Sequence, residues 1–347
     1  MPCRQGTARV TGAPAAAGLA LAASGLAVGV MLRFADRLPA AAPNARSLHA
    51  RPVPRVGGLA LWAGFAAGAS GVLADLPGGL AGWLPACAAL ILVSLLDDAR
   101  GAPVALRLSV HAAAGLWAAA WLLRMPGSAL PGVVPGAGYP LALVGVALVL
   151  AWSANLYNFM DGSDGLAGAM TLTGFGALAV AAAGDAPIAI AATALAAAAV
   201  PFLAVNRPPA RMFMGDVGAV PAGFMAALLG VAGVLRGDWA AWFPLLVFLP
   251  FVADASATLA RRALAGERLW HAHRDHYYQR FHQLGAGHRG TLAVHVVAML
   301  ATAATALACR AFAPGAGAAA LFAWCIGYAV AFAAIDYHWR RRPTATR

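Results

Sequence analysis

Long apolar runs, separated by short polar segments, occupy most of this sequence. A helix that crosses a bilayer needs about 17–25 mainly apolar residues, and runs of that kind recur along the whole chain. The pattern predicts about eleven spans, near residues 13–34, 56–74, 80–96, 106–124, 139–158, 165–183, 186–205, 217–235, 240–260, 291–311 and 316–336. Alanine and glycine are frequent in them, and small residues allow helices to approach closely. We therefore predict an all-α polytopic membrane helix bundle, with residues 1–347 forming a single integral membrane domain.

The arginines divide the connecting segments into two sets. Most of them fall in alternate loops, at residues 37–55, 100–107, 207–211 and 261–289, and in the tail at 340–342. The other loops carry only Arg4, Arg9, Arg124, Arg236 and Arg310. Because cytoplasmic loops of membrane proteins are enriched in basic residues, the first set is predicted to be cytoplasmic. The N-terminus is then outside and the C-terminus is cytoplasmic, which agrees with an odd number of spans.

Composition supports the membrane interpretation and excludes several kinds of chemistry. The chain is 61% apolar and only 11% charged, which is too little charge for the surface of a soluble protein of this length. Its net charge is +11 and it contains no lysine, so a P-loop lysine and a Schiff-base lysine are both excluded. In a chain of spans, a basic excess is typical of loops that face anionic lipids and anionic substrates rather than nucleic acid.

The cysteines do not indicate a disulfide framework, and a cleaved signal peptide is the alternative for the first apolar run. The four cysteines lack the spacing of a metal site, and three lie in apolar runs, so we interpret them as small apolar residues. The first apolar run, Ala13–Phe34, is longer than the usual core of a signal peptide. We interpret it as the first span.

The segment Asn155–Gly168, NLYNFMDGSDGLAG, is the most polar interruption of the apolar pattern. Its two asparagines are three residues apart, and so are its two aspartates, which places each pair on one face of a helix. Gly162 and Gly165 indicate a turn that comes close to a ligand. A polar loop between two spans is the alternative, but ionisable groups at membrane depth are costly and are usually functional.

Four further polar segments fall on the same predicted face of the bundle. They are the loop Pro43–Gly58, the pair Asp97–Asp98, the FMGD motif at Phe213–Asp216 and the His/Arg segment His271–Arg280. Because segments far apart in the sequence converge on one face, the pattern indicates an active site assembled across the bundle. Asp254 lies inside a predicted span, and we expect either a functional role or pairing with Arg261.

The residue types on this face suit a metal-assisted reaction of a phosphate compound. Several carboxylates with few histidines among them favour Mg²⁺ over zinc, with Mn²⁺ as an alternative. Arginine and histidine bind phosphate oxygens through charge-assisted hydrogen bonds. The predicted chemistry is therefore a reaction of a diphosphate with charge stabilised on its oxygens, and a site beside the bilayer suits a lipid phosphate as one substrate.

The order of these motifs between the spans resembles the family of polyprenyl-phosphate N-acetylhexosamine-1-phosphate transferases. The resemblance rests on an Arg/His loop before RVGG, then LLDD, NLYNFMDGSDGLAG, FMGD and a His-rich loop, and it covers nearly the whole chain. The family includes phospho-N-acetylmuramoyl-pentapeptide transferase and the enzymes that begin O-antigen and enterobacterial common antigen synthesis. The resemblance implies transfer of an N-acetylaminosugar-1-phosphate from a UDP-sugar to undecaprenyl phosphate, at the cytoplasmic face of the bacterial inner membrane. A homodimer is left open.

The resemblance also implies a role for individual residues. Asp216, with Asn158, is the expected Mg²⁺ site, and Asp97 with Asp98 is expected at the lipid phosphate, as a base or as its positioning group. We favour positioning, because a phosphate monoester is largely ionised near neutrality. The expected nucleotide and metal-proximal residues are Asn155, Asn158, Asp161 and Asp164, of which Asp164 is counted with Asp97 and Asp98 as catalytic. Asn206 and Phe213 are expected to hold the uracil.

The last loop departs from the family pattern. It reads HAHRDHYYQRFHQLG, so His273 and His276 keep two positions of a tighter histidine cluster while Asp275 replaces another. This variant is more similar to O-antigen members that accept deoxy N-acetylaminosugars than to the muramoyl-pentapeptide enzymes. Arg274 and Arg280 are then expected to face the diphosphate or the sugar. Arg107 is expected to replace a phosphate-binding lysine that follows the Asp–Asp pair in the family.

Three other functions fit parts of the pattern. A transporter or flippase suits about eleven spans, but its polar residues would be expected near the bilayer midplane rather than on one face. A CDP-alcohol phosphotransferase would have its carboxylates in one short motif, and an inactive scaffold would be expected to have lost some of the acids. The sequence leaves open which UDP-sugar is used, the polyprenol length and whether the reaction has one step or two.

Overall fold

The computed structural model describes residues 12–38, 40–41, 53–125, 138–182, 186–268 and 273–342. The predicted polar residues Arg46, His49, Arg51 and His271 lie outside these ranges. The α-helices are α2 (Gly12–Arg33), α3 (Gly57–Gly68), α4 (Gly79–Arg100), α5 (Val104–Leu122), α6 (Tyr139–Met160), α7 (Leu166–Ala181), α8 (Ala186–Asn206), α9 (Asp216–Arg236), α10 (Trp242–Val247), α11 (Leu249–Leu264), α12 (Tyr277–Phe281), α13 (Gly287–Phe312) and α14 (Gly317–Arg340). Shorter elements are the helical turns η1 (Ala35–Arg37), η2 (Leu73–Asp75), η3 (His282–Ala286) and η4 (Pro314–Ala316), and the strands β1 (Ala40–Ala41) and β2 (Val53–Pro54).

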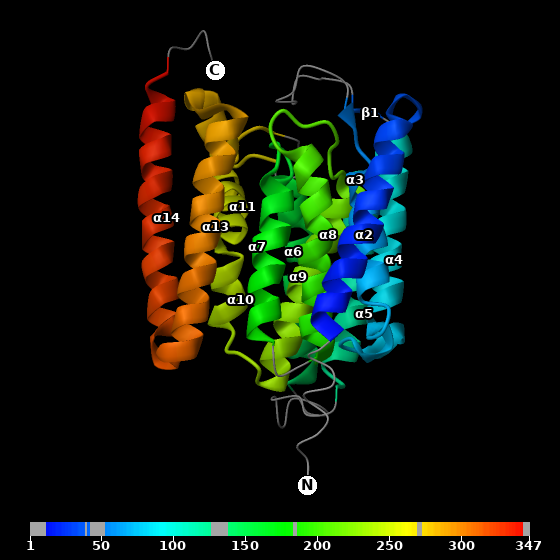
Figure 1. Cartoon of the computed structure of the whole chain (residues 1–347). Helices are drawn as coiled ribbons and strands as arrows, with labels where there is room; N and C mark the ends of the chain where they lie inside the picture. The colour runs from blue at the N-terminus through cyan, green and yellow to red at the C-terminus, as the bar shows by residue number, and fades with distance from the viewer. Residues whose placement is uncertain are drawn as a thin grey trace.

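The all-α membrane bundle predicted from the sequence is confirmed, and the chain is a multi-pass membrane protein. Within the described residues, 8 helices are long and apolar enough to cross a membrane, and α3 and α7 are shorter apolar helices. The count of about eleven spans stays a prediction. The start of α2 and the end of α14 lie at opposite ends of the bundle (Figure 1). Which of these ends faces the cytoplasm stays a prediction as well.

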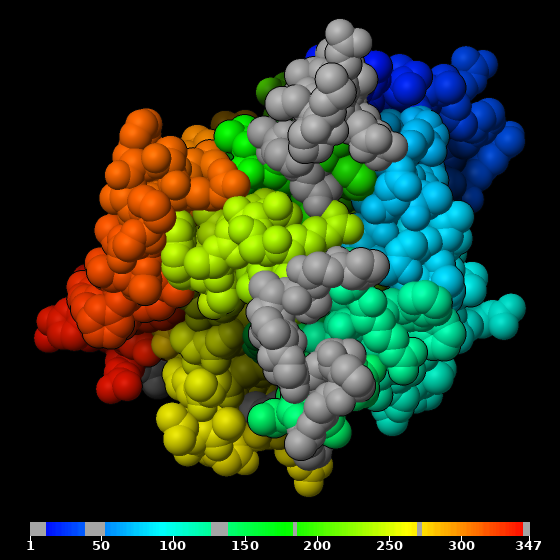
Figure 2. Space-filling model, turned by 90° about the horizontal axis from the view of Figure 1, so that it is seen from below, coloured from blue at the N-terminus to red at the C-terminus, as the bar shows by residue number. Residues whose placement is uncertain are grey.

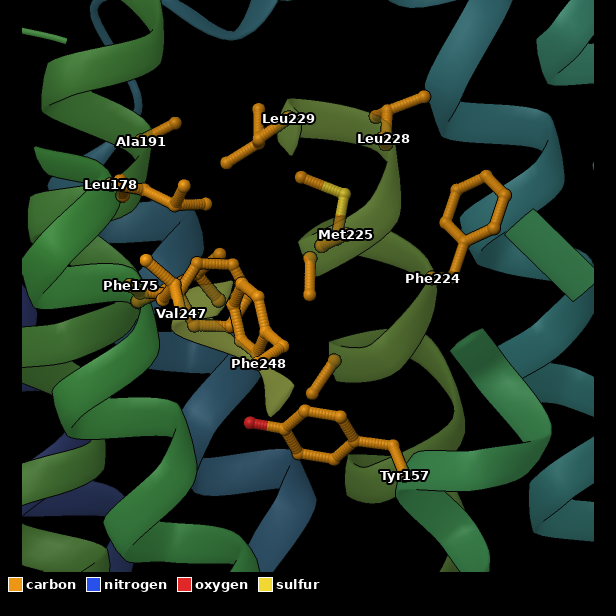
Figure 3. Close-up of a cluster of buried hydrophobic side chains, with 14 of the residues drawn as sticks. Tyr157, Phe175, Leu178, Ala191, Phe224, Met225, Leu228, Leu229, Val247 and Phe248 are labelled. Atoms are coloured by element: carbon orange, nitrogen blue, oxygen red, sulfur yellow. The ribbon is translucent and has the colours of Figure 1, made fainter. Parts of the chain in front are cut away.

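The centre of the bundle is formed by α6 to α10. Aromatic and aliphatic side chains from these helices meet there, among them Tyr157, Phe175, Phe224 and Phe248 (Figure 3). Helix α9 is buried over most of its length and packs against both α4 and α6. Figure 2 shows the bundle from the end opposite to the one where α14 ends. Helices α13 and α14 lie at one side of it, and the N-terminal helices α2 to α5 lie at the other side. This arrangement makes α9 the scaffold on which the polar end of the bundle is built.

The outer helices keep an apolar surface. Leu141 of α6 is 80% exposed and Phe322 of α14 is 68% exposed. A soluble monomer rarely leaves apolar surface of this extent uncovered. The exposed apolar side chains are therefore the lipid-facing surface of a membrane bundle, in agreement with the lengths of the helices.

A short backbone ladder fastens the segment before α3 to the loop that begins α9. Strands β1 and β2 pair antiparallel, and the amide of Phe213 donates to the carbonyl of Pro54 at 2.8 Å. The amide of Gly57 in turn donates to the carbonyl of Phe213 at 2.9 Å. Any side chain at Gly58 would overlap the backbone of Gly218 in α9. The two glycines thus allow α3 and α9 to touch and place the FMGD loop.

Candidate active site

Four aspartates gather where α4 and α6 end and α9 begins, at the end of the bundle where α14 also ends (Figure 1). Asp97 and Asp98 lie in the last turn of α4, Asp161 follows α6 directly, and Asp216 is the first residue of α9. These residues come from three of the predicted polar segments. The acid cluster, as we call Asp97, Asp98, Asp161 and Asp216, is therefore built across the bundle as the sequence indicated.

Arg107, in the first turn of α5, joins two members of the acid cluster. Its Nη1 lies 2.5 Å from Oδ2 of Asp97 and 3.7 Å from Oδ2 of Asp216. The other oxygen of Asp97 accepts the backbone N–H of Ala102 at 2.6 Å, in the turn between α4 and α5. Both oxygens of Asp97 are thus held by the protein, and Arg107 is brought to the predicted site.

Asn158 links the end of α6 to the start of α9. Its Nδ2 donates to Oδ2 of Asp216 at 3.2 Å, so the two residues expected at a metal are in contact. One turn earlier, Nδ2 of Asn155 donates to the carbonyl of Ala151 at 2.7 Å, and its side chain lies beside the imidazole of His111. Asn155 therefore lies one turn deeper in the bundle than the acid cluster.

Arg55 is a site residue that our sequence interpretation named only as a loop arginine. Its Nη1 lies 3.9 Å from Oδ1 of Asp98, and its charge also acts on Asp161 and Asp216. It enters the acid cluster because the ladder before α3 fastens its segment to the FMGD loop. That pairing across about 160 residues of chain leaves no local signal in the sequence.

Burial and repulsion shape the charge of the acid cluster. Asp161 is deeply surrounded, and this burial raises its pKa well above the usual range; the charge of Asp216 raises it further, while Arg55 lowers it. With all groups ionised, four carboxylates face the two guanidinium groups of Arg55 and Arg107, so the cluster has an excess of two negative charges. Like charges so close together favour a proton or a cation among them.

The donor set of the acid cluster fits a hard divalent cation. Oδ2 of Asp98 is buried and has no hydrogen-bond partner within the described ranges, and it lies 3.1 Å from where a Cβ at Gly215 would be. No group of three or more His, Cys, Asp or Glu side chains in those ranges is arranged as a complete protein-built metal site. Mg²⁺, however, usually binds through one or two carboxylates and completes its shell with waters and substrate phosphates.

Asp164 belongs to a second group of polar residues, and its contacts are with this group rather than with the acid cluster. Its Oδ2 accepts the backbone N–H of Ala210 at 3.0 Å, and its Oδ1 lies 3.6 Å from Nδ1 of His288 in α13. The same nitrogen of His288 lies 3.1 Å from Oγ of Ser163 and accepts the backbone N–H of Asp164 at 3.2 Å. A catalytic role for Asp164 stays a prediction, and His288 is a neighbour that the sequence did not suggest.

Both polar atoms of the Asn206 side chain are hydrogen-bonded to the backbone of the fold. Its Oδ1 accepts the N–H of Gly165 at 3.0 Å and its Nδ2 donates to the carbonyl of Met212 at 2.8 Å, with the side chain 2% exposed. It thereby ties the start of α7 to the loop before α9. Phe213 lies in that loop and is half-buried. Their expected part in holding uracil stays a prediction, and for Asn206 the geometry favours a supporting role.

The last loop is fastened by Asp254 of α11. Its carboxylate accepts the backbone N–H of Tyr277 at 2.9 Å and that of Tyr278 at 2.7 Å, and it lies 3.3 Å from Nδ1 of His276. The imidazole of His273 stacks on that of His276, with ring centroids 5.0 Å apart. Burial lowers the pKa of His273 to about 4, and the charge of His276 lowers it further. The two predicted histidines are thus brought together.

Arg280 and Arg274 differ in their surroundings. Arg280 donates to Oδ1 of Asp336 in α14 at 2.6 Å and lies 3.5 Å from Oδ1 of Asp275. Its guanidinium group is therefore already paired with carboxylates of the protein. Arg261, our expected partner for Asp254, also donates to Asp336, at 3.2 Å. The Nε of both Arg274 and Arg280 is buried without a hydrogen-bond partner among the residues described, so the two differ in the carboxylate contacts that Arg280 alone makes. Of the two loop arginines, Arg274 is the better placed to meet a ligand.

Comparison with known proteins identifies a matching family and several relatives of this chain. The family model described as glycosyl transferase family 4 matches residues 80–234. Decaprenyl-phosphate N-acetylglucosaminephosphotransferase of Mycobacterium tuberculosis is 31% identical in an alignment 304 positions long that covers 76% of this chain and 74% of the relative. The chain belongs to glycosyl transferase family 4. The family resemblance expected from the sequence is confirmed.

Other known proteins match the chain to different extents. The probable undecaprenyl-phosphate N-acetylglucosaminyl 1-phosphate transferase of Bacillus subtilis is 24% identical over 73% of this chain and 72% of its own length. Phospho-N-acetylmuramoyl-pentapeptide-transferase of Symbiobacterium thermophilum is 40% identical, but over only 27% of this chain and 29% of its own length. The family match at 80–234 includes the acid cluster and ends before Asp254 and the last loop.

Proposed function

We propose that this protein transfers an N-acetylaminosugar-1-phosphate from a UDP-sugar to undecaprenyl phosphate or another polyprenyl phosphate, with release of UMP. The observation that carries the proposal is the acid cluster with Arg55 and Arg107, at one end of a membrane bundle of glycosyl transferase family 4. The relatives matched over most of the chain are named as transferases of N-acetylglucosamine phosphate to polyprenyl phosphates. The product would begin O-antigen or another cell-surface polysaccharide.

In the proposed reaction an oxygen of the polyprenyl phosphate attacks the β-phosphorus of the UDP-sugar. A phosphorus–oxygen bond forms to the lipid, and the bond between that phosphorus and UMP breaks. The attacking phosphate is largely ionised near neutral pH, so little is gained from a protein base. Asp97 supports this interpretation, because both of its oxygens already accept hydrogen bonds, from Arg107 and from the backbone of Ala102. We assign Asp97 to holding Arg107 toward the phosphates.

Arg55 and Arg107 supply the positive charge that the reacting phosphates need. Each has a guanidinium group beside an aspartate rather than buried in a closed ion pair, and Arg55 is 45% exposed. Preorganised cations of this kind stabilise the charge that develops on non-bridging oxygens. Asp98 and Asp216, with Asn158, would hold Mg²⁺ or Mn²⁺. A divalent ion there would neutralise diphosphate oxygens and offset the negative excess of the acid cluster.

The donor would lie between the acid cluster and the last loop. His276 stacks near Phe159, with ring centroids 5.7 Å apart, and Phe159 is the neighbour of Asn158. Arg274, His273 and His276 are then within the segment that would contact the diphosphate or the sugar. We propose that this site faces the cytoplasm of a bacterial cell, where the arginine-rich loops are expected. N-acetylglucosamine is the first sugar to test, followed by deoxy N-acetylaminosugars.

The test is turnover by the purified full-length chain in detergent. UMP release would be followed with undecaprenyl phosphate, Mg²⁺ and a panel of UDP-N-acetylaminosugars, with lipid or metal omitted in turn. We expect release that needs both, and loss of most turnover in Asp216→Asn. Asp75→Asn is the matched control, because Asp75 is an exposed acid in η2, just before the start of α4, whereas the acid cluster lies at the end of that helix. Release without lipid, or normal turnover in Asp216→Asn, would refute the proposed chemistry.

A further inference from the structure

Asp254 is a buried carboxylate with four donors around it. Its side chain is 1% exposed, and it accepts the backbone N–H groups of Tyr277 and Tyr278 and the hydroxyl of Thr258, the last at 3.3 Å. Nδ1 of His276 completes the set at 3.3 Å. A carboxylate removed from water in this way is stable only when its oxygens are hydrogen-bonded. Three of these donors belong to residues 276–278, so the carboxylate holds that short segment as a unit.

Helix α12 depends on this carboxylate. It has 5 residues, which is too short to be stable without outside contacts. The N–H groups in the first turn of a helix have no partner inside it. In α12 two of them, those of Tyr277 and Tyr278, donate to the carboxylate of Asp254. His276 is the residue just before α12, and its backbone N–H meets Oε1 of Gln279 at 3.3 Å. The position of His276 is therefore set by Asp254 through both its ring and the helix that follows.

The fastened segment lies against the acid cluster. The hydroxyl of Tyr278 donates to the carbonyl of Phe159 at 3.0 Å, one residue beyond Asn158. The rings of His276 and Phe159 are 5.7 Å apart. One chain of contacts thus runs from Asp254 through α12 to the end of α6, where Asn158 contacts Asp216.

We propose that Asp254 is a positioning residue for the transfer reaction, holding His276, and His273 stacked upon it, at the end of α6 where the donor diphosphate is handled. The inference rests on the proposed function. It assigns Asp254 no contact with substrate and no proton transfer. Asp254 contributes the correct placement of His276. If His276 were displaced by about 1 Å, the rate of the transfer reaction would fall by about 100-fold.

A second anchor on the same helix supplies a matched control. On its other side α12 is held by Asp336 of α14, which accepts Nη1 of Arg280 at 2.6 Å and the hydroxyl of Tyr277 at 3.2 Å. Asp336 makes no described contact with His276. A loss caused by loosening α12 in general would therefore appear in Asp336→Asn, whereas a loss caused by misplacing His276 would appear only in Asp254→Asn.

The experiment compares turnover of Asp254→Asn, His276→Gln, the double variant and Asp336→Asn in the full-length protein. We expect kcat to fall by about 100-fold in each of the first two. Because Asp254 acts through His276, the double variant should be no slower than His276→Gln alone. Asp336→Asn should keep kcat within about threefold. Wild-type kcat in Asp254→Asn, or losses that multiply in the double variant, would overturn the proposal.

Two further measurements keep the test decisive. If Asp254→Asn does not fold, Thr258→Val removes one donor to the same carboxylate, and its kcat should fall. Wild-type kcat in the folded Thr258→Val variant would then overturn the proposal. If the wild-type protein turns over no sugar, the proposed function fails, and hydrogen exchange of residues 273–281 then tests the anchor by itself. Faster exchange confined to that segment in Asp254→Asn supports the positioning role, and unchanged exchange overturns it.

Discussion

Gly162→Ala tests how the turn after α6 meets the last loop. Gly162 lies in the turn after Asp161 and is exposed, and its backbone does not adopt a conformation that requires glycine. A methyl group would ordinarily be harmless there, or stabilising by about 0.4–1 kcal/mol through the unfolded chain. A Cβ at this position, however, would overlap the hydroxyl of Tyr278 and come within 3.3 Å of Nε2 of Gln279.

The size of the effect follows from these contacts. The hydroxyl of Tyr278 is held by its hydrogen bond to Phe159 and the ring is buried, so it has little room to move. Overpacking at such a site costs about 1–3 kcal/mol, and breaking the hydrogen bond adds about 1 kcal/mol. We expect Gly162→Ala to lower the free energy of unfolding by about 2–4 kcal/mol. Turnover should fall as well, because Tyr278 and His276 move together.

The assay is unfolding in detergent by titration with SDS, paired with UMP release. Gly145→Ala is the matched control, since Gly145 lies in α6 and a Cβ there meets nothing within 4 Å. Tyr278→Phe should partly rescue Gly162→Ala, because it removes the overlapping oxygen. If Gly162→Ala unfolds like the wild-type protein, or if Tyr278→Phe brings no rescue, the contact described here does not govern this turn.

Three other perturbations follow from the site. Arg107→Gln should lower turnover by about 100-fold while Asp75→Asn does not, and equal rates would contradict the role given to Arg107. Asn206→Ala should destabilise the fold by about 1–3 kcal/mol for each of the two backbone groups it leaves unpaired, measured by the same titration; a variant of normal stability with only a raised KM for the UDP-sugar would instead support uracil binding. Burial lowers the pKa of His273 to about 4, below the usual 6.5, so the unfolded chain binds a proton that the folded chain does not, and stability should fall as pH drops from 6.5 toward 4. His273→Gln should flatten that part of the profile, and an unchanged profile would show that His273 is not its source.

Much of the fold was predictable because a bilayer imposes lengths and polarity that a single sequence displays. The apolar runs gave the helices, and the polar motifs at their ends gave the site end of the bundle. Asp97, Asp161 and Asp216 meet because α4 and α6 end, and α9 begins, at the same end of the bundle. The number of spans was harder to read, since α3, α7 and the pair α10–α11 are short or interrupted.

Partners across long distances in sequence were not predictable. Arg55 reaches the acid cluster only because β2 and the start of α3 pair with the loop before α9. Asp164 resembled the neighbouring Asp161 in the sequence, yet its carboxylate binds Ala210 and lies near His288. Spacing within one segment shows which side chains share a face, but the facing segment decides what each of them meets.

The arginines of the last loop show why this distinction matters for substrate recognition. Arg280 was expected at the diphosphate or the sugar. Its guanidinium group instead donates to Asp336, 56 residues later in the chain. Breaking such a pair to bind a ligand would leave the partly buried carboxylate of Asp336 with only one of its two cations, Arg261, which is costly. No such carboxylate contact holds Arg274 among the described residues, and its Nε, like that of Arg280, is buried without a hydrogen-bond partner. Arg274, held next to the histidines that Asp254 positions, is therefore the loop cation from which selection of the donor should be explored first.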